Sequence, residues 1–230
     1  MATGKPKGLP LISELPRFAV IEHDDHVAQG VEQLIAVEPR FSRVVQTHGI
    51  PSARRVKNDL SSLLKIIVEQ LISLRAADSI WRRIEMQLHP FDAAEILKLE
   101  HNQLKSFGLT GAKAKCFLAI CHAVHTGELN FLALHHIPDE AVLKKLMSVS
   151  GIGPWTADIY LLSALGRADA FPSGDLALQV AAQDLLGLKG RPTPKQFLVL
   201  AEVWRPWRSV AARLLWSHYR GLKSLSQRVK

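Results

Sequence analysis

The chain has 230 residues, 47% of them hydrophobic, which is enough for one domain or two small lobes with a substantial core. Its 29 basic and 21 acidic residues give a formal charge of +8, and this balance favours a polyanionic partner, most often nucleic acid. Two cysteines, Cys116 and Cys121, are too few for a disulfide framework or a four-thiolate metal site. The N-terminal residues do not resemble a signal peptide, and no apolar run approaches the roughly 18 residues that a spanning helix needs, so we expect an intracellular protein without a membrane partner.

Apolar residues recur at helical spacing from the first quarter of the chain onward. Residues 1–16 are rich in Gly, Pro and Lys and are expected to form a mobile tail. A helix is then predicted to begin at a cap provided by Asp24 or Asp25 and to end before Pro39, and a short helix follows that ends at Gly49.

The middle of the chain continues this pattern. A strongly apolar helix is predicted after Asp59, and polar Gln70 and Ser73 interrupt its pattern before the next helix begins near Leu74. Another helix is predicted to extend to His125, after short helical segments that precede it.

The last third of the chain is also helical by periodicity. Helices are predicted to open at Asp139, after Asp175 and after Thr193, and the last helix is expected from about Trp207 to Tyr219. No alternating strand pattern is found. About ten helices joined by short turns predict an all-α, two-lobed helical bundle, in which residues 17–57 and 176–230 form one lobe and residues 58–175 form the other.

A Gly-Ile-Gly turn at residues 151–153 joins two of these helices, and the unit formed by the two helices and the turn is expected at about residues 139–166. Gly151 and Gly153 allow backbone N–H groups to approach a phosphate, and Pro154 suits the first position of the helix that follows. A purely structural turn is the competing interpretation. The positive net charge favours phosphate binding, with Thr156 as a further contact. Apolar residues on both sides are expected to fix the turn in the core: Leu146, Val149, Ile152, Trp155 and Ile159.

A single carboxylate, Asp175, follows this hairpin at the start of another helix. An Asp before an apolar helix is most often an N-cap, and the residues alone favour that role. The same carboxylate also places a negative charge near the expected phosphate site. A helix N-terminus stabilises a negative charge, so Asp175 can cap the helix and also supply a negative charge at this site.

Four motifs in order resemble those of the helix-hairpin-helix DNA glycosylases. Residues 149–158 (VSGIGPWTAD) with 171–175 (FPSGD) resemble the hairpin, the Gly/Pro-rich loop and the Asp of that superfamily. Residues 68–73 (VEQLIS) and 108–115 (GLTGAKAK) resemble its early helix and middle turn. Residues 204–209 (WRPWRS) with Trp216 are similar to the DNA-3-methyladenine glycosylase II branch. The resemblance extends from about residue 60 to the last helix and implies the HhH-GPD fold.

The resemblance implies an enzyme that hydrolyses the N-glycosidic bond of alkylated purines, of the 3-methyladenine or 7-methylguanine type, in base excision repair. Trp155 occupies the position of the Schiff-base Lys in relatives that also cut the strand, so no lyase activity is expected. The C-terminal region lacks the four closely spaced cysteines that hold an iron–sulfur cluster. A glycosylase for oxidised or deaminated bases, and a non-catalytic helix-hairpin-helix DNA-binding protein, remain alternatives.

The same resemblance assigns roles at the base site. Asp175 is expected to stabilise positive charge on the sugar and to orient or deprotonate the attacking water, with Asp158 as a weaker candidate. Trp155 and Trp216 fall at the base-pocket positions. Ile159 stands where relatives carry an aromatic residue, and Tyr160 is adjacent to it.

DNA contacts are implied at three further places. Gln70 and Leu71 are expected to form the wedge that fills the gap left by a flipped nucleotide, although the helix phase of Leu71 also permits a place in the core. The backbone carbonyls of Met147, Val149 and Ile152 resemble those that hold a Na or K ion; no other cofactor is expected. Basic phosphate contacts are expected among Lys113, Lys115, Arg205 and Arg208. The expected partner is double-stranded DNA with damaged bases, bound by a monomer.

Overall fold

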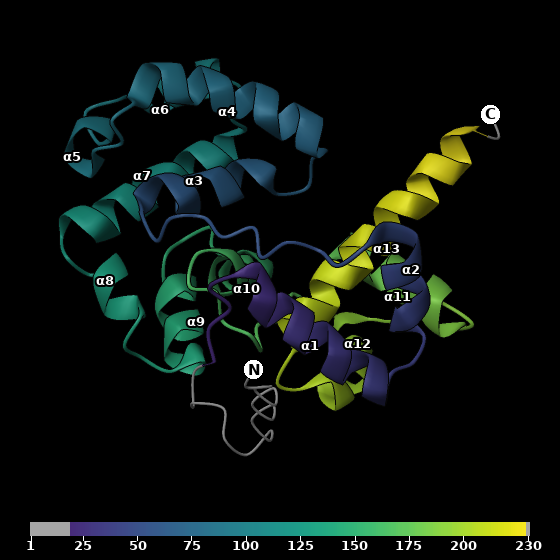
Figure 1. Cartoon of the computed structure of the whole chain (residues 1–230). Coiled ribbons are helices and arrows are strands. Elements are labelled where there is room, and N and C mark those ends of the chain that lie inside the picture. Colours follow the sequence, from purple (N-terminus) through teal and green to yellow (C-terminus); the bar gives the residue numbers. More distant parts are fainter. Residues whose placement is uncertain (1–18, 229–230) are drawn as a thin grey trace, which may run out of the picture.

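The computed structural model describes residues 19–228, and the regular secondary structure of this part of the chain is helical (Figure 1). An isolated antiparallel bridge joins Val20 and Arg167. Within the described range, no helix is both long and apolar enough to cross a bilayer. The helices are α1 Asp24–Val37, α2 Phe41–His48, α3 Leu60–Glu69, α4 Leu74–Leu88, α5 Ala93–Ile96, α6 His101–Ser106, α7 Gly111–His125, α8 Phe131–Leu134, α9 Asp139–Met147, α10 Pro154–Ser163, α11 Leu176–Leu186, α12 Pro194–Leu200, the 3-10 turn η2 Ala201–Trp204 and α13 Arg208–Arg228.

The helices pack in two groups with α10 between them. In one group α7 packs against α3, α5 and α6, and α4 packs on α3. In the other, α13 packs against α11, and α1 and α2 from the start of the chain pack on α13 from its end. Figure 1 shows these groups on opposite sides of α10, which contacts both α9 and α3. The predicted all-α class is therefore confirmed, and the predicted mobile tail, residues 1–16, lies outside the described residues.

Helix caps follow the sequence in most places. The Asp59 carboxylate accepts from the Ser62 N–H at 2.9 Å, as expected of an N-cap. The start of α1 differs, because its N-cap is His23 and neither predicted Asp takes that position. Asp24 instead accepts from the Ala53 N–H at 2.7 Å, which links α1 to the segment before α3. The last helix also extends beyond the predicted end, to Arg228.

Two arginines fix the C-terminal end of α10. The last carbonyls of a helix lack an intrahelical donor. Arg55 donates to Ser163 O at 3.2 Å and to Ala164 O at 2.6 Å, and Arg213 donates to Leu162 O at 3.3 Å. Burial lowers the pKa of Arg213 to about 10. The helix that carries Trp155 is thus anchored at the end far from that residue.

Candidate functional site

The turn between α9 and α10 is anchored in the core by its apolar side chains. One of its positions, Gly151, requires glycine. Val149 and Ile152 are buried, as predicted. Gly151 has φ +91°, and a Cβ there would lie 2.6 Å from Cys116 Cβ. Gly153 is the N-cap of α10, Pro154 is the first helical residue, and no side-chain or distant backbone atom lies within 4 Å of a Cβ built on Gly153. The space beside Gly153 at the start of α10 is therefore open, and the N-terminus of a helix suits an anion.

Thr156 does not present its side chain to a phosphate, contrary to the sequence expectation. It is only 1% exposed, and its hydroxyl accepts a hydrogen bond from Gln70 Nε2 at 2.8 Å. The third residue of α10 points toward the end of α3 and not toward solvent. Its backbone N–H remains the group that suits a phosphate contact.

Three helices converge on the Asp175 carboxylate. Asp175 is the N-cap of α11, and its Oδ1 accepts from the Leu178 N–H at 3.0 Å, so the predicted capping role is confirmed. The Trp155 indole N–H from α10 donates to Oδ2 at 2.8 Å. The Trp216 indole N–H from α13 donates to Oδ1 at 3.3 Å. Residues separated by 20 and 41 positions in the sequence thus orient one carboxylate.

These contacts surround the carboxylate with hydrogen-bond donors. An indole N–H donates and cannot accept, so both tryptophans present donors to the carboxylate oxygens of Asp175. Trp155 and Trp216 are each partly buried, and so is Asp175. The arrangement presents a fixed negative charge between two aromatic side chains, which suits recognition and stabilisation of a cationic group.

The neighbours of Trp155 along α10 divide between two faces. Ile159 lies one turn after Trp155 and is partly buried. Tyr160 lies about 140° further around the helix from Trp155. It is 0% exposed, and its hydroxyl donates to Asn58 Oδ1 at 2.6 Å. Tyr160 is therefore a core residue between α10 and the start of α3, and the prediction that it lines a base pocket is wrong.

Asp158, on the turn of α10 next to Trp155, is a half-buried carboxyl group. Burial raises its pKa to about 7, and the attraction of Arg208 opposes that rise. The Asp175 carboxylate, by comparison, accepts hydrogen bonds from three N–H groups.

Leu71 projects fully from the loop between α3 and α4. Its relative exposure is 104% and its φ is +58°, an unusual backbone conformation for a branched side chain. Ile72 and Leu74 beside it are also exposed. The core position that the helix phase of Leu71 permitted is excluded. Gln70, its predicted companion, turns away and donates to Thr156.

Three of the four basic residues expected at phosphates are engaged elsewhere. Lys113 is 9% exposed, and its ammonium donates to Val68 O and Gln70 O, both at 2.8 Å. Arg208 is also 9% exposed and pairs with Asp169 at 2.7 Å. Arg205 pairs with Asp169 and with Glu202. Each of these cations is held by protein acceptors. Lys115 is exposed and stays a candidate phosphate contact.

The expected monovalent ion concerns backbone carbonyls of the hairpin turn. Val149 O accepts from the Ile152 N–H at 3.1 Å, and a carbonyl oxygen keeps a second lone pair for an ion. The donor set of Met147, Val149 and Ile152 is therefore compatible with Na or K. Among the described residues, no group of three or more His, Cys, Asp or Glu is arranged to hold a metal. Cys116 and Cys121 are buried, and burial raises the pKa of both thiols to about 12.

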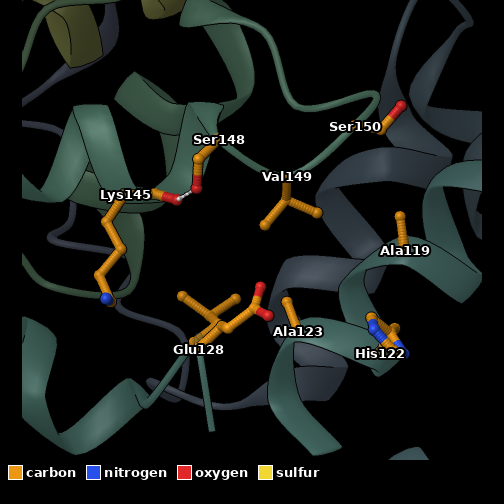
Figure 2. Close-up of a pocket in the computed structure, with 9 residues that line it drawn as sticks. Ala119, His122, Ala123, Glu128, Lys145, Ser148, Val149 and Ser150 are labelled. Atoms are coloured by element: carbon orange, nitrogen blue, oxygen red, sulfur yellow. Dashed lines mark hydrogen bonds between the residues drawn. The ribbon is translucent and has the colours of Figure 1, made fainter. Parts of the chain in front are cut away.

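A separate hollow of about 200 Å³ is lined in part by the hairpin residues Ser148, Val149 and Ser150 (Figure 2). In Figure 2, Val149 projects from the hairpin toward Glu128 and Ala123. None of the residues that hold the Asp175 carboxylate lines this hollow, so it is not the expected base pocket. Its lining is Ala119, His122, Ala123, Glu128, Leu129, Lys145, Ser148, Val149 and Ser150.

Comparison with known proteins agrees with this architecture. The family model described as "HhH-GPD superfamily base excision DNA repair protein" matches residues 64–208. The DNA-3-methyladenine glycosylase of Bacillus subtilis is 30% identical over 121 residues, which cover 53% of this chain and 40% of that protein. DNA-3-methyladenine glycosylase 1 of Schizosaccharomyces pombe is 24% identical over 77% of this chain and 79% of its own.

One solved structure is similar to this chain in both fold and sequence. The DNA-3-methyladenine glycosidase from Bacillus halodurans is 28% identical, with a TM-score of 0.69 over 85% of this chain and 91% of that one. The chain spans less than two thirds of the length of several curated relatives that it matches. The match over residues 64–208, together with the hairpin and the converging helices at Asp175, shows that the chain belongs to the HhH-GPD superfamily of base excision DNA repair proteins.

Proposed function

We propose that this protein is a monofunctional DNA glycosylase that removes alkylated purines from double-stranded DNA and leaves an abasic site. The observation that carries the proposal is the Asp175 carboxylate, held by the indole N–H groups of Trp155 and Trp216. Relatives named DNA-3-methyladenine glycosylases support the substrate class. A DNA-binding module without catalysis has no need for a carboxylate fixed in this way.

Access to the glycosidic bond requires the nucleotide to leave the base stack. Extrusion from a duplex costs a few kcal/mol. Leu71, at 104% exposure, is the side chain that fills the gap and lowers the cost of the extruded state. The N–H groups that begin α10, at the Gly151–Gly153 turn, hold a backbone phosphate near the extruded nucleotide.

The chemistry that follows suits one carboxylate. Loss of the base builds positive, oxocarbenium-like charge on the sugar. The Asp175 carboxylate, already oriented by its hydrogen bonds, stabilises that charge. The same oxygen atoms orient or deprotonate the attacking water. A 3-methyladenine or 7-methylguanine base is already cationic, so it stacks favourably on an indole and leaves without a general acid.

The variant Asp175→Asn tests this mechanism. Asn is also a good N-cap, so α11 and the fold are preserved. We expect Asp175→Asn to abolish release of methylated purines from alkylated DNA while DNA binding is retained. Asp92→Asn is the matched control, because Asp92 caps α5 by similar hydrogen bonds to Ala94 N and Glu95 N away from Asp175. Unchanged release by Asp175→Asn refutes the mechanism, and release of only oxidised or deaminated bases by the wild type refutes the substrate class.

The absence of strand cleavage is a separate part of the proposal. A lyase forms a Schiff base through an amine, and the indole of Trp155 has no nucleophilic amine. Borohydride added during turnover is expected to trap no covalent protein–DNA adduct, whereas alkali treatment of the product cuts the strand at each abasic site. A borohydride-stable adduct contradicts this part and leaves the role of Asp175 intact.

A further inference from the structure

Lys113 was expected from the sequence to contact a DNA phosphate, but its ammonium is buried. Desolvation of a charged amine is costly unless it is compensated by acceptors, and burial lowers the pKa of Lys113. Its Nζ donates to Val68 O and to Gln70 O, both at 2.8 Å. Both carbonyls lie at the C-terminal end of α3, where orphan acceptors and the negative end of the helix dipole favour a cation.

The chain turns sharply at the point where Lys113 holds it. Helix α3 ends at Glu69, and Gln70 leaves the helical conformation with ψ 125°. Leu71 follows with φ +58°, a left-handed conformation that is unfavourable for a residue other than glycine. The exposed side chain of Leu71 makes no compensating burial, so its backbone conformation has to be stabilised by neighbouring residues.

Gln70 connects this turn to two other helices. Its carbonyl accepts from Lys113 of α7, and its side-chain amide donates to Thr156 of α10 at 2.8 Å. Thr156 is adjacent to Trp155, which contacts the Asp175 carboxylate. A continuous set of hydrogen bonds therefore leads from α7 through the residue before Leu71 to the helix that carries the base site.

We propose that Lys113 is a positioning residue that holds Leu71 in its projecting conformation and, through Gln70 and Thr156, in register with the base site. The inference rests on the proposed function, because it assigns Leu71 the work of extrusion. Lys113 thus serves nucleotide flipping without touching DNA, in place of the phosphate contact expected from the sequence.

The test separates flipping from chemistry. Lys113→Met keeps the aliphatic stem and removes the donors, and single-turnover base release is measured on two duplexes. One carries a methylated purine in a normal pair, and the other carries it opposite an abasic site, where less pairing has to be broken. We expect release from the paired duplex to slow at least tenfold and release from the unpaired lesion to stay within about threefold of wild type. Lys98→Met is the matched control, because Lys98 forms an exposed pair with Glu95, and such pairs contribute little.

Two further variants make the result specific. Leu71→Ala is expected to show the same selective loss, and the double variant with Lys113→Met is expected to be no slower than Leu71→Ala alone on paired DNA. Lys113→Arg keeps donors in place and is expected to restore part of the loss. If Lys113→Met does not fold, Lys113→Gln replaces it, because the shorter amide reaches at most one of the two carbonyls. The same ratio of base-release rates on the paired and the unpaired duplex is then expected.

The outcomes distinguish this inference from the proposed function. An equal loss on both duplexes, no loss on either, or additive losses in the double variant overturns the positioning role of Lys113. If the wild type releases no base even from the unpaired lesion, the proposed function itself fails. The positioning role is then read from the fluorescence of a 2-aminopurine beside the lesion, which wild type raises on binding and Lys113→Met does not if the inference holds.

Discussion

Protonation of Asp158 is expected to make the folding stability of this protein depend on pH. Burial raises its pKa to about 7 from the ordinary 3.8, so the folded protein binds a proton that the unfolded chain has already lost between these values. The stability that this proton contributes is therefore fully present below about pH 4 and is lost as pH rises through about 7. Asp158→Asn, which resembles the protonated form in shape, removes this dependence.

The magnitude follows from the size of the pKa shift. Between pH 5 and pH 8 about two of the three pKa units are titrated, which corresponds to roughly 3 kcal/mol at the upper limit. Asp158 is partly exposed to water, and screening reduces this to about 2 kcal/mol. For a chain of this size, 1 kcal/mol changes Tm by about 2–4 °C, so the expected effect is about 4–8 °C.

Thermal unfolding at pH 5 and pH 8 and constant ionic strength measures the effect. We expect the Tm of Asp158→Asn relative to wild type to rise by several degrees between the two values. Glu69 and Asp139 also have pKa values raised by burial, but their contributions cancel in the difference between the two proteins. A Tm difference that is the same at both pH values refutes the reasoning. Base release by Asp158→Asn is expected within a few-fold of wild type, and a loss as severe as that of Asp175→Asn assigns the catalytic role to both.

Two further variants test the hairpin and the corrected position on α10. Gly151→Ala places a Cβ 2.6 Å from Cys116 Cβ at φ +91°, so we expect a loss of about 1–3 kcal/mol in a denaturant titration and weaker DNA binding. Gly190→Ala, with no atom within 4 Å of the new Cβ, is its control, and equal effects of the two substitutions contradict the packing explanation. Tyr160→Phe removes the 2.6 Å hydrogen bond to Asn58 and is expected to cost about 1 kcal/mol of stability without slowing base release. If Tyr160→Phe slows base release without lowering stability, Tyr160 does contribute to the base site.

The parts of the site that were predictable from the sequence are those set by local rules or by motif position. A capping Asp before an apolar helix is a local signal, and the structure places Asp175 there. Family resemblance placed Trp155 and Trp216 at the base pocket, but their hydrogen bonds to Asp175 were not predicted, because the two residues lie 61 positions apart in the sequence. Leu71 was ambiguous by helix phase. Its exposure depends on the left-handed turn after α3, which no local pattern announces in a residue other than glycine.

The incorrect expectations share a physical cause. The charge of Lys113 or Arg208 is visible in a sequence, but its partner is a tertiary property. A basic residue on a helix in a protein of charge +8 suggests a phosphate, yet Arg208 pairs with Asp169 and Lys113 with main-chain carbonyls. Tyr160 was grouped with Ile159 by adjacency, although one residue along a helix turns the side chain by about 100°.

Helix α10 is the element through which these features act together. Its first turn meets the hairpin, its Trp155 holds the Asp175 carboxylate, and its Thr156 accepts from the residue before Leu71. Arg55 and Arg213 fix its last carbonyls from two other parts of the chain. The residues proposed to bind phosphate, to form the wedge and to hold the carboxylate are therefore all tied to one helix. A catalytic constellation loses rate steeply when its groups shift by about 1 Å. The anchoring of α10 by Arg55 and Arg213 therefore supports the geometry of the proposed site.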